Sequence, residues 1–442
     1  MAIEVDATKG VSDIYVPFVE ETRRVVTASE DGSALVWKFS EKELQCEAAL
    51  TFACGGHHAG ITSVAFAPAC YNELAVRGST GAVLATASKD CSLKIWTLEG
   101  LKPPKCSTLA ARPGFYYSAV DGEDPSAAAQ EASKAKPSEG HKDFVNMVSW
   151  YERAEPRSRA QLVSSSTDMT ARTWDVASGR CTQTLRKEGI GHSGAVSMAQ
   201  FSHDGNLLLT CSQDKLCILW DPQKEDTLMK TFPSHQSGEA PHAGAVWSAR
   251  FCCDSSKIVT ASADHKAFVW SVVTGHVEGR LLHDDAVLSA RWARDDKTLV
   301  LTCSYDGCAK LWDLRAKQAV NTFRDHDTSV AVWSAEFGQN NNTVLTASHD
   351  MNAHVYDLRF NMPKHVLSGH NGILWQASLT NDGRWAITCS EDGTARVWNI
   401  HKGDRYPSFH VLKTRARQHT EAVTCADFQE FVSDSGQRVG QI

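Results

Sequence analysis

Histidine, a hydroxyl residue and aspartate recur together along this sequence, and these three residue types can form a catalytic triad. The clearest set is His283, Thr302 and Asp306, followed by Trp312. In a triad, the histidine takes the proton of the hydroxyl nucleophile while the carboxylate orients the imidazole ring. Six further sets have the same order and similar spacing: His57, Thr86, Asp90 and Trp96; His141, Ser164, Asp168 and Trp174; His192, Thr210, Asp214 and Trp220; His242, Thr260, Asp264 and Trp270; His326, Thr346, Asp350 and Tyr356; His370, Thr388, Asp392 and Trp398.

This repetition argues against catalysis. So many near-equivalent catalytic centres in one chain make no chemical sense, whereas one structural core in each repeat does. Buried imidazole, hydroxyl and carboxylate groups all need hydrogen-bond partners, and a chain of charge-assisted bonds among them satisfies all three. The sequence contains no CxxC or HExxH motif, so it predicts neither a dedicated metal site nor a cofactor. The sets are therefore expected to stabilise the fold.

The hydroxyl residue, aspartate and tryptophan of each set belong to a short β-hairpin, best seen at Leu301 to Arg315, LTCSYDGCAKLWDLR. Leu301 to Cys303 begin a β-favouring run, Asp306-Gly307 supplies the turn, and Ala309 to Trp312 resume the apolar pattern. A further strand precedes each hairpin, and the histidine stands upstream of that strand. In the second half of the chain the closing aromatic residues recur every 42 to 50 residues or so, about the period of a four-stranded propeller blade.

These motifs resemble those of the WD-repeat family, and the resemblance extends over nearly the whole chain. In that family the His, the Ser or Thr, the Asp and the Trp form a hydrogen-bonded tetrad inside each blade. The resemblance implies an all-β fold, a single closed β-propeller of WD-repeat blades over residues 1–442, with eight blades favoured and seven as the alternative. Residues 112–140 are expected to form a flexible inserted loop, because Ala, Ser, Glu, Lys and Pro dominate most of this segment.

The two ends of the sequence leave the closure of the ring open. The first unit has a strand pattern over Ile14 to Phe18 but carries Lys9 where the histidine is expected. Residues 419–442 begin a partial ninth repeat that starts with His419. Either this segment closes the ring by supplying His419 to the first blade, or the first blade is self-contained and the segment packs elsewhere. In both cases the edges of the first and last blades should meet, because unpaired sheet edges favour aggregation.

Composition restricts the compartment and the partners. The 442 residues carry a net charge of −7, so no global attraction to nucleic acid or to an anionic membrane is expected. Of the 14 cysteines, at least Cys211, Cys217, Cys303 and Cys389 stand in strand-like runs, where thiols pack as small apolar groups, and this indicates a reducing compartment. The sequence has no signal-peptide pattern and no apolar run of about 18 residues. We expect a soluble cytoplasmic protein, with cytoskeletal, ciliary or nuclear sites left open, that binds other proteins and no small-molecule substrate.

One position in the first strand of each unit is a candidate partner-binding site. It lies four residues before the closing aromatic residue or Leu, and in the WD-repeat family it lies toward the narrow face around the central channel. In the last four units it is occupied by Trp247, Leu288, Trp333 and Trp375. Clustered exposed aromatic residues are typical interface anchors. The alternative is that neighbouring blades half-bury these side chains in a structural role.

Two Asp-x-Arg boxes are further candidates. Asp313 with Arg315, and Asp357 with Arg359, end the hairpins of two consecutive units. Paired boxes of this kind resemble those of substrate receptors of cullin-type ubiquitin ligases, in which the Asp and the Arg contact the ligase adaptor protein. The favoured alternative is structural: the Asp helps to close the blade turn and the Arg is an ordinary surface cation.

The sequence therefore favours a non-enzymatic protein-interaction scaffold that is one subunit of a larger multiprotein assembly. The first alternative is a ubiquitin-ligase substrate receptor that uses the two boxes. The second alternative is an enzyme with its site at the channel mouth, which no nucleophile elbow, phosphate-binding loop or metal motif supports.

Overall fold

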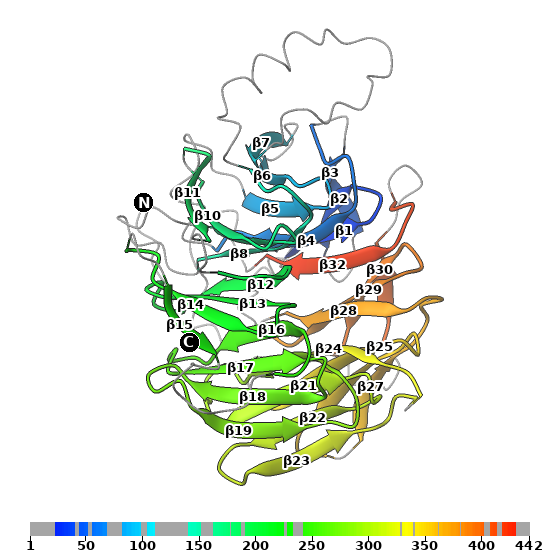
Figure 1. The fold of residues 1–442 in the computed structure, drawn as a ribbon. Helices are drawn as coiled ribbons and strands as arrows, with labels where there is room; N and C mark the ends of the chain where they lie inside the picture. The colour runs from blue at the N-terminus through cyan, green and yellow to red at the C-terminus, as the bar shows by residue number, and fades with distance from the viewer. Residues whose placement is uncertain are drawn as a thin grey trace, which may run out of the picture.

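The computed structural model describes residues 23–39, 44–51, 55–68, 82–98, 104–110, 140–151, 162–176, 178–186, 191–224, 228–232, 242–327, 329–338, 341–360, 362–380, 382–401, 407–412 and 418–429. These residues form eight four-stranded antiparallel sheets, arranged as the blades of a propeller (Figure 1). The favoured count of eight blades is confirmed. Residues 112–139 of the predicted inserted loop lie outside this description. No helix long and apolar enough to cross a membrane occurs in the ranges given.

Each blade is named here by its order around the ring, and its strands are given from the inner to the outer edge. Blade 1 comprises β32 (Val423–Phe428), β1 (Arg23–Ser29), β2 (Ala34–Phe39) and β3 (Leu44–Leu50). Blade 2 comprises β4 (Ile61–Phe66), β5 (Ala82–Ser88), β6 (Leu93–Leu98) and β7 (Lys105–Ala110). Blade 3 comprises β8 (Val145–Trp150), β9 (Leu162–Ser166), β10 (Ala171–Asp175) and β11 (Arg180–Leu185). Blade 4 comprises β12 (Val196–Phe201), β13 (Leu208–Ser212), β14 (Cys217–Trp220) and β15 (Leu228–Phe232).

The remaining blades follow the same plan. Blade 5 comprises β16 (Val246–Phe251), β17 (Lys257–Ser262), β18 (Lys266–Ser271) and β19 (Val277–Leu282). Blade 6 comprises β20 (Val287–Trp292), β21 (Leu299–Ser304), β22 (Ala309–Asp313) and β23 (Gln318–Phe323). Blade 7 comprises β24 (Val332–Phe337), β25 (Thr343–Ser348), β26 (Ala353–Asp357) and β27 (Pro363–Leu367). Blade 8 comprises β28 (Leu374–Leu379), β29 (Trp385–Ser390), β30 (Ala395–Asn399) and β31 (Phe409–Val411).

The turn between the second and third strands of a blade is held by the aspartate of its set. In blade 6, Asp306 Oδ1 accepts the backbone N–H of Cys308 over 3.0 Å, as in an Asx turn. Gly307 between them has a left-handed φ of 74°. The same position in blades 4 and 5 is taken by Lys215 with φ 75° and His265 with φ 68°. The aspartate bond therefore holds the turn even where a side chain makes left-handed backbone costly.

The apolar cores lie between neighbouring blades. Between blades 1 and 8, Trp37 and Phe39 pack with Trp385 and Ile387, and the rings of Phe39 and Trp385 meet edge to face at 5.3 Å. Seven further clusters combine the other adjacent pairs of blades in the same way. Each blade is therefore stabilised by both of its neighbours, and a closed ring buries more apolar surface than an open one.

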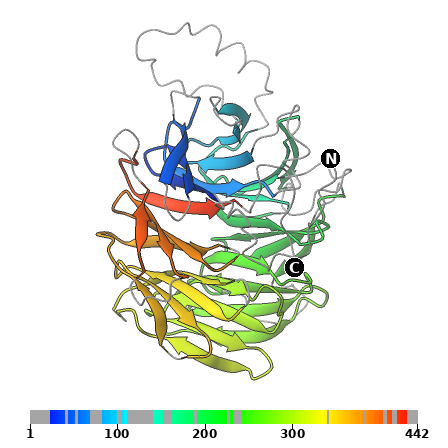
Figure 2. The same cartoon turned by 180° about the vertical axis from the view of Figure 1, so that it is seen from behind.

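Blade 1 takes its inner strand from the C-terminal part of the sequence. Strand β32 pairs antiparallel with β1, with Thr27 opposite Ala426. Figure 2 shows this strand, coloured red, between the blue strands of blade 1 and the orange strands of blade 8. Of the two closures that the sequence left open, the structure therefore has the first. The inner-strand position that we expected residues 14–18 to fill belongs to β32, and residues 14–18 themselves lie outside the description.

Candidate functional site

The residues of the triad-like sets meet inside the blades as hydrogen-bonded chains. In blade 6, Trp312 Nε1 donates to Thr302 Oγ1 over 2.8 Å, and Thr302 Oγ1 lies 2.7 Å from His283 Nε2. His283 Nδ1 lies 2.7 Å from Asp306 Oδ2. A neutral ring that accepts the threonine proton at Nε2 and donates Nδ1–H to the carboxylate satisfies every group. Because Thr302 is completely buried and its oxygen already accepts the indole N–H, it cannot reach a substrate, and the set is structural.

The same chain recurs around the ring. In blades 2, 3, 4, 5, 7 and 8 the histidine lies 2.8 to 3.0 Å from its aspartate and 2.7 to 2.8 Å from its hydroxyl partner. Blade 7 carries Tyr356 in place of Trp, and its hydroxyl lies 3.2 Å from His354 Nδ1. In blade 1 the missing histidine is supplied by His419, whose Nε2 lies 2.9 Å from Thr27 Oγ1. The sequence thus identified the members of these chains correctly.

Burial sets the charge states in the chains. Burial lowers the pKa of His283, and this effect outweighs the attraction of Asp306. Burial also lowers the pKa of His57, His141 and His370. For Asp306, burial raises the pKa, but hydrogen bonds from His283 and from two backbone N–H groups bring it down to about 2. In the chains of His57, His141, His283 and His370, a neutral imidazole beside an ionised carboxylate is therefore the stable pairing at neutral pH.

We expect the protein to lose stability as the pH falls from 7.5 to 5. In this window the histidines of the unfolded chain take up protons, whereas the buried rings, whose pKa values are lowered by burial, take up fewer. The unfolded state then binds more protons than the folded state. Below about pH 6.5, each such histidine therefore lowers the free energy of unfolding by up to about 1.4 kcal/mol for each pH unit. The carboxylate contribution of Asp306 disappears only at lower pH, below its unfolded value of 3.8 and toward its folded value of about 2. Urea midpoints at pH 7.5, 6 and 5 measure the effect, and equal midpoints would contradict neutral buried histidines.

A second group of side chains gathers on one face of the ring. The rings of Trp333 and Trp375 lie 5.0 Å apart, and Tyr305 packs edge-on between Trp333, at 5.3 Å, and Trp247, at 6.4 Å. We call Trp247, Tyr305, Trp333 and Trp375 the aromatic cluster. Tyr305 is 39% exposed and the three tryptophans are half-buried. Leu288, predicted to join them, packs instead against the core between blades 6 and 7.

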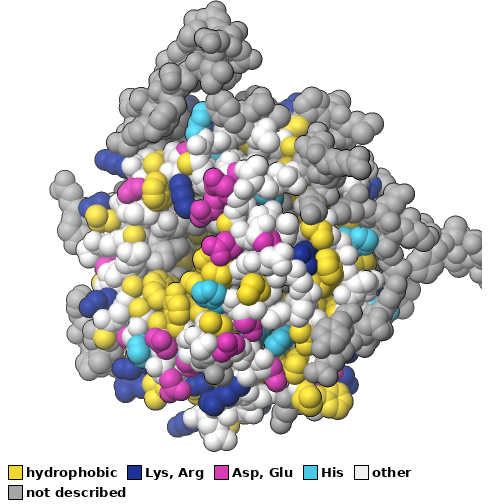
Figure 3. Space-filling view, turned by 90° about the vertical axis from the view of Figure 1, so that its right-hand side faces the viewer, with side chains coloured by type: hydrophobic (Ala, Val, Ile, Leu, Met, Phe, Trp, Pro, Cys, Tyr) yellow, Lys and Arg dark blue, Asp and Glu magenta, His cyan; other side chains and the backbone are white. Residues whose placement is uncertain are grey.

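The cluster lies where the inner strands begin. β32 runs from right to left in Figure 1, so the first residues of the inner strands lie at the right-hand face, which Figure 3 shows. Apolar side chains gather on part of that face, with acidic side chains around them. The turn that carries Tyr305 is tied to this end of β20, because its backbone N–H donates to Ala286 O over 3.0 Å. Tyr305 was not predicted from the sequence. The usable signal was an aromatic residue in the turn of blade 6, between two units that carry Trp247 and Trp333 in their first strands.

The other half of this rim is built differently. At the position equivalent to the tryptophans, Thr424 donates to Ile61 O over 3.0 Å and Asn146 donates to Val196 O over 2.8 Å, each across to the next blade. Thr62 makes the same kind of bond to Val145. Small polar side chains therefore tie neighbouring blades together here, whereas the aromatic residues are confined to blades 5 to 8.

The two Asp-x-Arg boxes are paired within themselves. Arg315 Nη2 lies 2.8 Å from Asp313 Oδ2, and Arg359 Nε lies 2.8 Å from Asp357 Oδ1. Both arginine side chains are largely exposed, at 68% and 73%. Each Asp also accepts the backbone N–H of its own Arg, so it helps to close the turn. Contact with a ligase adaptor stays a prediction, and the geometry fits the structural alternative.

In the described ranges, no group of three or more His, Cys, Asp or Glu side chains is arranged to hold an ion. Eight of the cysteines described there are free thiols: Cys211, Cys217, Cys252, Cys253, Cys303, Cys308, Cys389 and Cys425.

Comparison with known proteins places this geometry in context. A family model described as "WD domain, G-beta repeat" matches residues 48–97, 179–221, 227–271, 275–313, 317–357 and 361–399, which is more than half of the chain. Angio-associated migratory cell protein of Homo sapiens is 24% identical over 344 residues, which cover 75% of this chain and 74% of that protein. The computationally designed Ika8 protein has a similar structure, with a TM-score of 0.58, 19% identity, and coverage of 83% of this chain and 90% of that one. At this identity the likeness concerns the fold alone.

Two further relatives are similar over a smaller share of their own length. Transducin beta-like protein 3 of Bos taurus is 25% identical over 271 residues, 60% of this chain but 32% of the relative. This chain therefore matches about a third of that protein's length. The ribosome biogenesis protein WDR12 homolog of Drosophila yakuba is 23% identical over 310 residues, 69% of this chain and 52% of the relative.

Proposed function

The chain belongs to the WD-repeat family of protein-interaction propellers, and from this premise we propose that it is a non-enzymatic scaffold subunit of a larger assembly that binds a partner protein on the aromatic cluster. One observation carries the proposal: three tryptophans and a tyrosine, linked ring to ring, remain partly exposed on one face. Large aromatic side chains in a patch are the commonest anchors of protein interfaces.

The cluster tryptophans differ from those of the blade cores. The core tryptophans of blades 1 to 6 and 8 all donate their indole N–H to a buried hydroxyl. Within the part of the chain that the structure describes, the indole nitrogens of Trp333 and Trp375 have no hydrogen-bond partner. These two tryptophans therefore lie outside the hydrogen-bonded chains of the blades, and it is their partly exposed rings that a partner protein can reach.

Charge favours a basic partner segment. Asp284 and Asp285 are exposed shortly before β20, and Asp327 is exposed shortly before β24. Glu391 is an exposed turn residue. Its own backbone N–H donates to Ile373 O, which lies beside the start of β28. Carboxylates around tryptophan faces suit Lys and Arg side chains, which gain both ion pairing and cation–π attraction. We therefore propose a partner segment rich in Lys or Arg.

The test is to replace Trp333 and Trp375 together by Ala. We expect binding of a fluorescein-labelled Lys- and Arg-rich peptide to weaken about 30-fold or more, since a tryptophan anchor contributes about 2 kcal/mol or more. Fluorescence anisotropy at low and high salt measures the affinity, and binding by the wild type should fall with salt. Cellular partners are then pulled down with the wild type and with the double variant and quantified by mass spectrometry. This comparison identifies the assembly.

The matched control is Phe360→Ala, which removes another exposed aromatic side chain, 64% exposed, from the segment after β26. This variant should bind the peptide and the partners as the wild type does. If the double tryptophan variant folds normally and retains both, the aromatic cluster is not a docking surface.

A further inference from the structure

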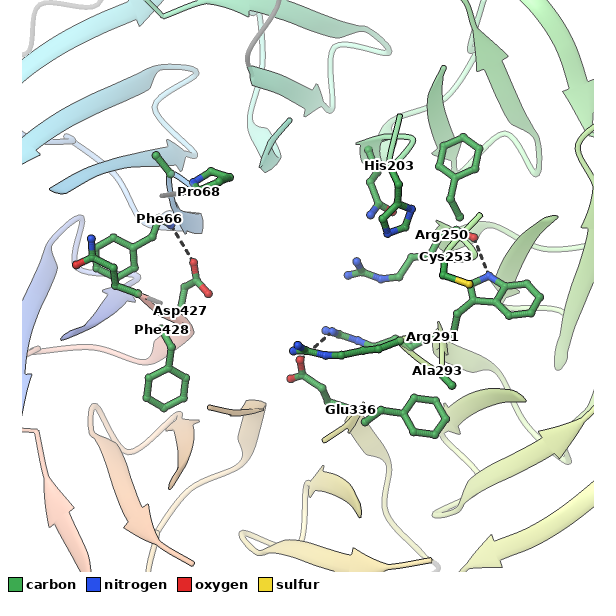
Figure 4. Close-up of a pocket in the computed structure, with 17 residues that line it drawn as sticks. Phe66, Pro68, His203, Arg250, Cys253, Arg291, Ala293, Glu336, Asp427 and Phe428 are labelled. Carbon is green, nitrogen blue, oxygen red and sulfur yellow. Dashed lines mark hydrogen bonds and ion pairs between the residues drawn. The ribbon is translucent and has the colours of Figure 1, made fainter. Parts of the chain in front are cut away.

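A cavity of about 670 Å³ lies where the inner strands end, at the opposite end of these strands from the aromatic cluster (Figure 4). Its walls include the fifth residue of five inner strands: Gln200, Arg250, Arg291, Glu336 and Asp427. Arg250 and Arg291 come from neighbouring blades, and both point toward the open centre in Figure 4. We call this cavity the arginine pocket.

The carboxylate beside Arg291 does not form a close ion pair with it. Glu336 Oε1 lies 3.4 Å from Arg291 Nη1, which is longer than a charge-assisted hydrogen bond of about 2.7 to 2.9 Å. Asp427 stands across the opening from both arginines (Figure 4) and accepts the backbone N–H of Phe66 over 2.8 Å. With Arg294 also in the wall, the pocket holds one more arginine than carboxylates, in a protein whose net charge is −7.

Several polar atoms around the pocket lack partners in the protein. Arg291 Nε, Glu336 Oε2, Gln200 Oε1 and His203 Nδ1 are buried and make no hydrogen bond to any residue that the structure describes. A buried polar group left unsatisfied costs about 1 to 3 kcal/mol. Four such groups around one cavity indicate a site built to hydrogen-bond a ligand rather than a packed core.

The wall chemistry identifies the class of ligand. Guanidinium groups pair with carboxylate or phosphate oxygens. Glu336 and Asp427 in the wall would repel a doubly charged phosphate more strongly than a single carboxylate, so a carboxylate fits the pocket better. Phe66, Pro68 and Phe428 lie on the far side of the opening (Figure 4), where they can receive an apolar side chain next to the acid.

We propose that the arginine pocket binds an acidic peptide segment of a partner protein, with a Glu or Asp carboxylate between Arg250 and Arg291 and an apolar side chain against Phe66 and Phe428. Glu336 occupies part of this place in the free protein and is displaced from Arg291 when the peptide binds. The site is separate from the aromatic cluster, so the protein can hold an acidic segment on one face and a basic segment on the other.

The experiment measures binding of a fluorescein-labelled peptide GEEFEEG to the full chain by anisotropy, with GQQFQQG as the uncharged control. We expect Arg291→Gln to weaken binding about 10-fold or more, and Glu336→Gln to tighten it several-fold, because a competing carboxylate is lost. Arg315→Gln, an exposed arginine on another part of the surface, is the matched control and should bind as the wild type does. The Trp333→Ala, Trp375→Ala variant should also retain this binding, so failure here is distinguishable from failure of the aromatic cluster.

Three results would overturn the proposal. The first is equal binding of the Glu and Gln peptides by the wild type. The second is displacement of the labelled peptide by inorganic phosphate or a phosphoserine peptide, at concentrations where the unlabelled Glu peptide does not displace it. This result would make the pocket a phosphate site. The third is unchanged or weaker binding by Glu336→Gln; this variant decides the question even if the arginine variants fold poorly, as judged by circular dichroism.

Discussion

Deletion of residues 419–442 is expected to open the ring and to lower the unfolding temperature by about 5 °C or more. The deletion removes β32, so β1 loses its antiparallel partner and the chain through Thr27 loses His419. It also removes Val423 and Ala426 from the core between blades 1 and 8. Loss of a buried strand and a buried hydrogen bond costs on the order of 5 kcal/mol or more, which lowers the unfolding temperature of a chain of 442 residues by about 5 °C. The exposed edge of β1 should also promote aggregation.

Differential scanning fluorimetry and light scattering measure both effects. The matched control is deletion of residues 431–442, which leaves β32 intact and should unfold as the full chain does. A synthetic peptide of residues 418–430, added to the longer deletion, should raise its unfolding temperature with increasing concentration, because it binds only the folded state. If the longer deletion unfolds at the temperature of the full chain, β32 does not close the ring.

Thr302→Val is expected to have the second largest effect, a loss of about 2 to 5 kcal/mol of unfolding free energy. Valine keeps the shape of threonine but removes the oxygen that accepts from Trp312 Nε1 and lies beside His283 Nε2. Both nitrogens are then left buried without a partner. The change in the urea midpoint, followed by tryptophan fluorescence, measures the loss.

Thr302→Ser is the matched control. Serine fills this role naturally in blade 3, where Ser164 lies 2.7 Å from His141 Nε2 and accepts from Trp174 Nε1 over 2.8 Å. This variant should therefore lose much less stability than the valine variant. A double-mutant cycle with Trp312→Phe should give a coupling energy of about 1 kcal/mol or more, because both substitutions break one bond. Additive effects would mean that the chain of hydrogen bonds does not act as a unit.

The blade interior was predictable from the sequence because its chemistry is repeated. Each chain of His, hydroxyl, Asp and Trp uses the same residue types at similar spacing, so a single copy such as His283 to Trp312 is confirmed by the others. Ring closure was not predictable to the same degree. Ile14 to Phe18 and Val423 to Phe428 both carry a first-strand pattern, and the structure pairs Val423 to Phe428, as β32, with β1.

The surfaces were harder to predict, because their residues are unique rather than repeated. Tyr305 joins the tryptophans only after the turn of blade 6 is folded against the start of β20. The arginine pocket was missed, although a signal was present. Arg250, Arg291 and Glu336 stand at the fifth position of three consecutive inner strands, where blades 2, 3 and 8 have Ala or Ser. Charged residues at an equivalent position of adjacent repeats point to a common site at the axis.

Blade 1 also determines when the protein can finish folding during its synthesis. Thr27 and His419 are 392 positions apart in the chain, and ribosomes add about 5 to 20 residues per second. The edge of β1 therefore waits roughly 20 to 80 seconds for its inner strand after it has been made. Throughout that interval the other blades can assemble in order, but the nascent chain carries one three-stranded sheet with an open edge. Completion of the ring is the last step, and the newly made protein depends on protection of that edge until then.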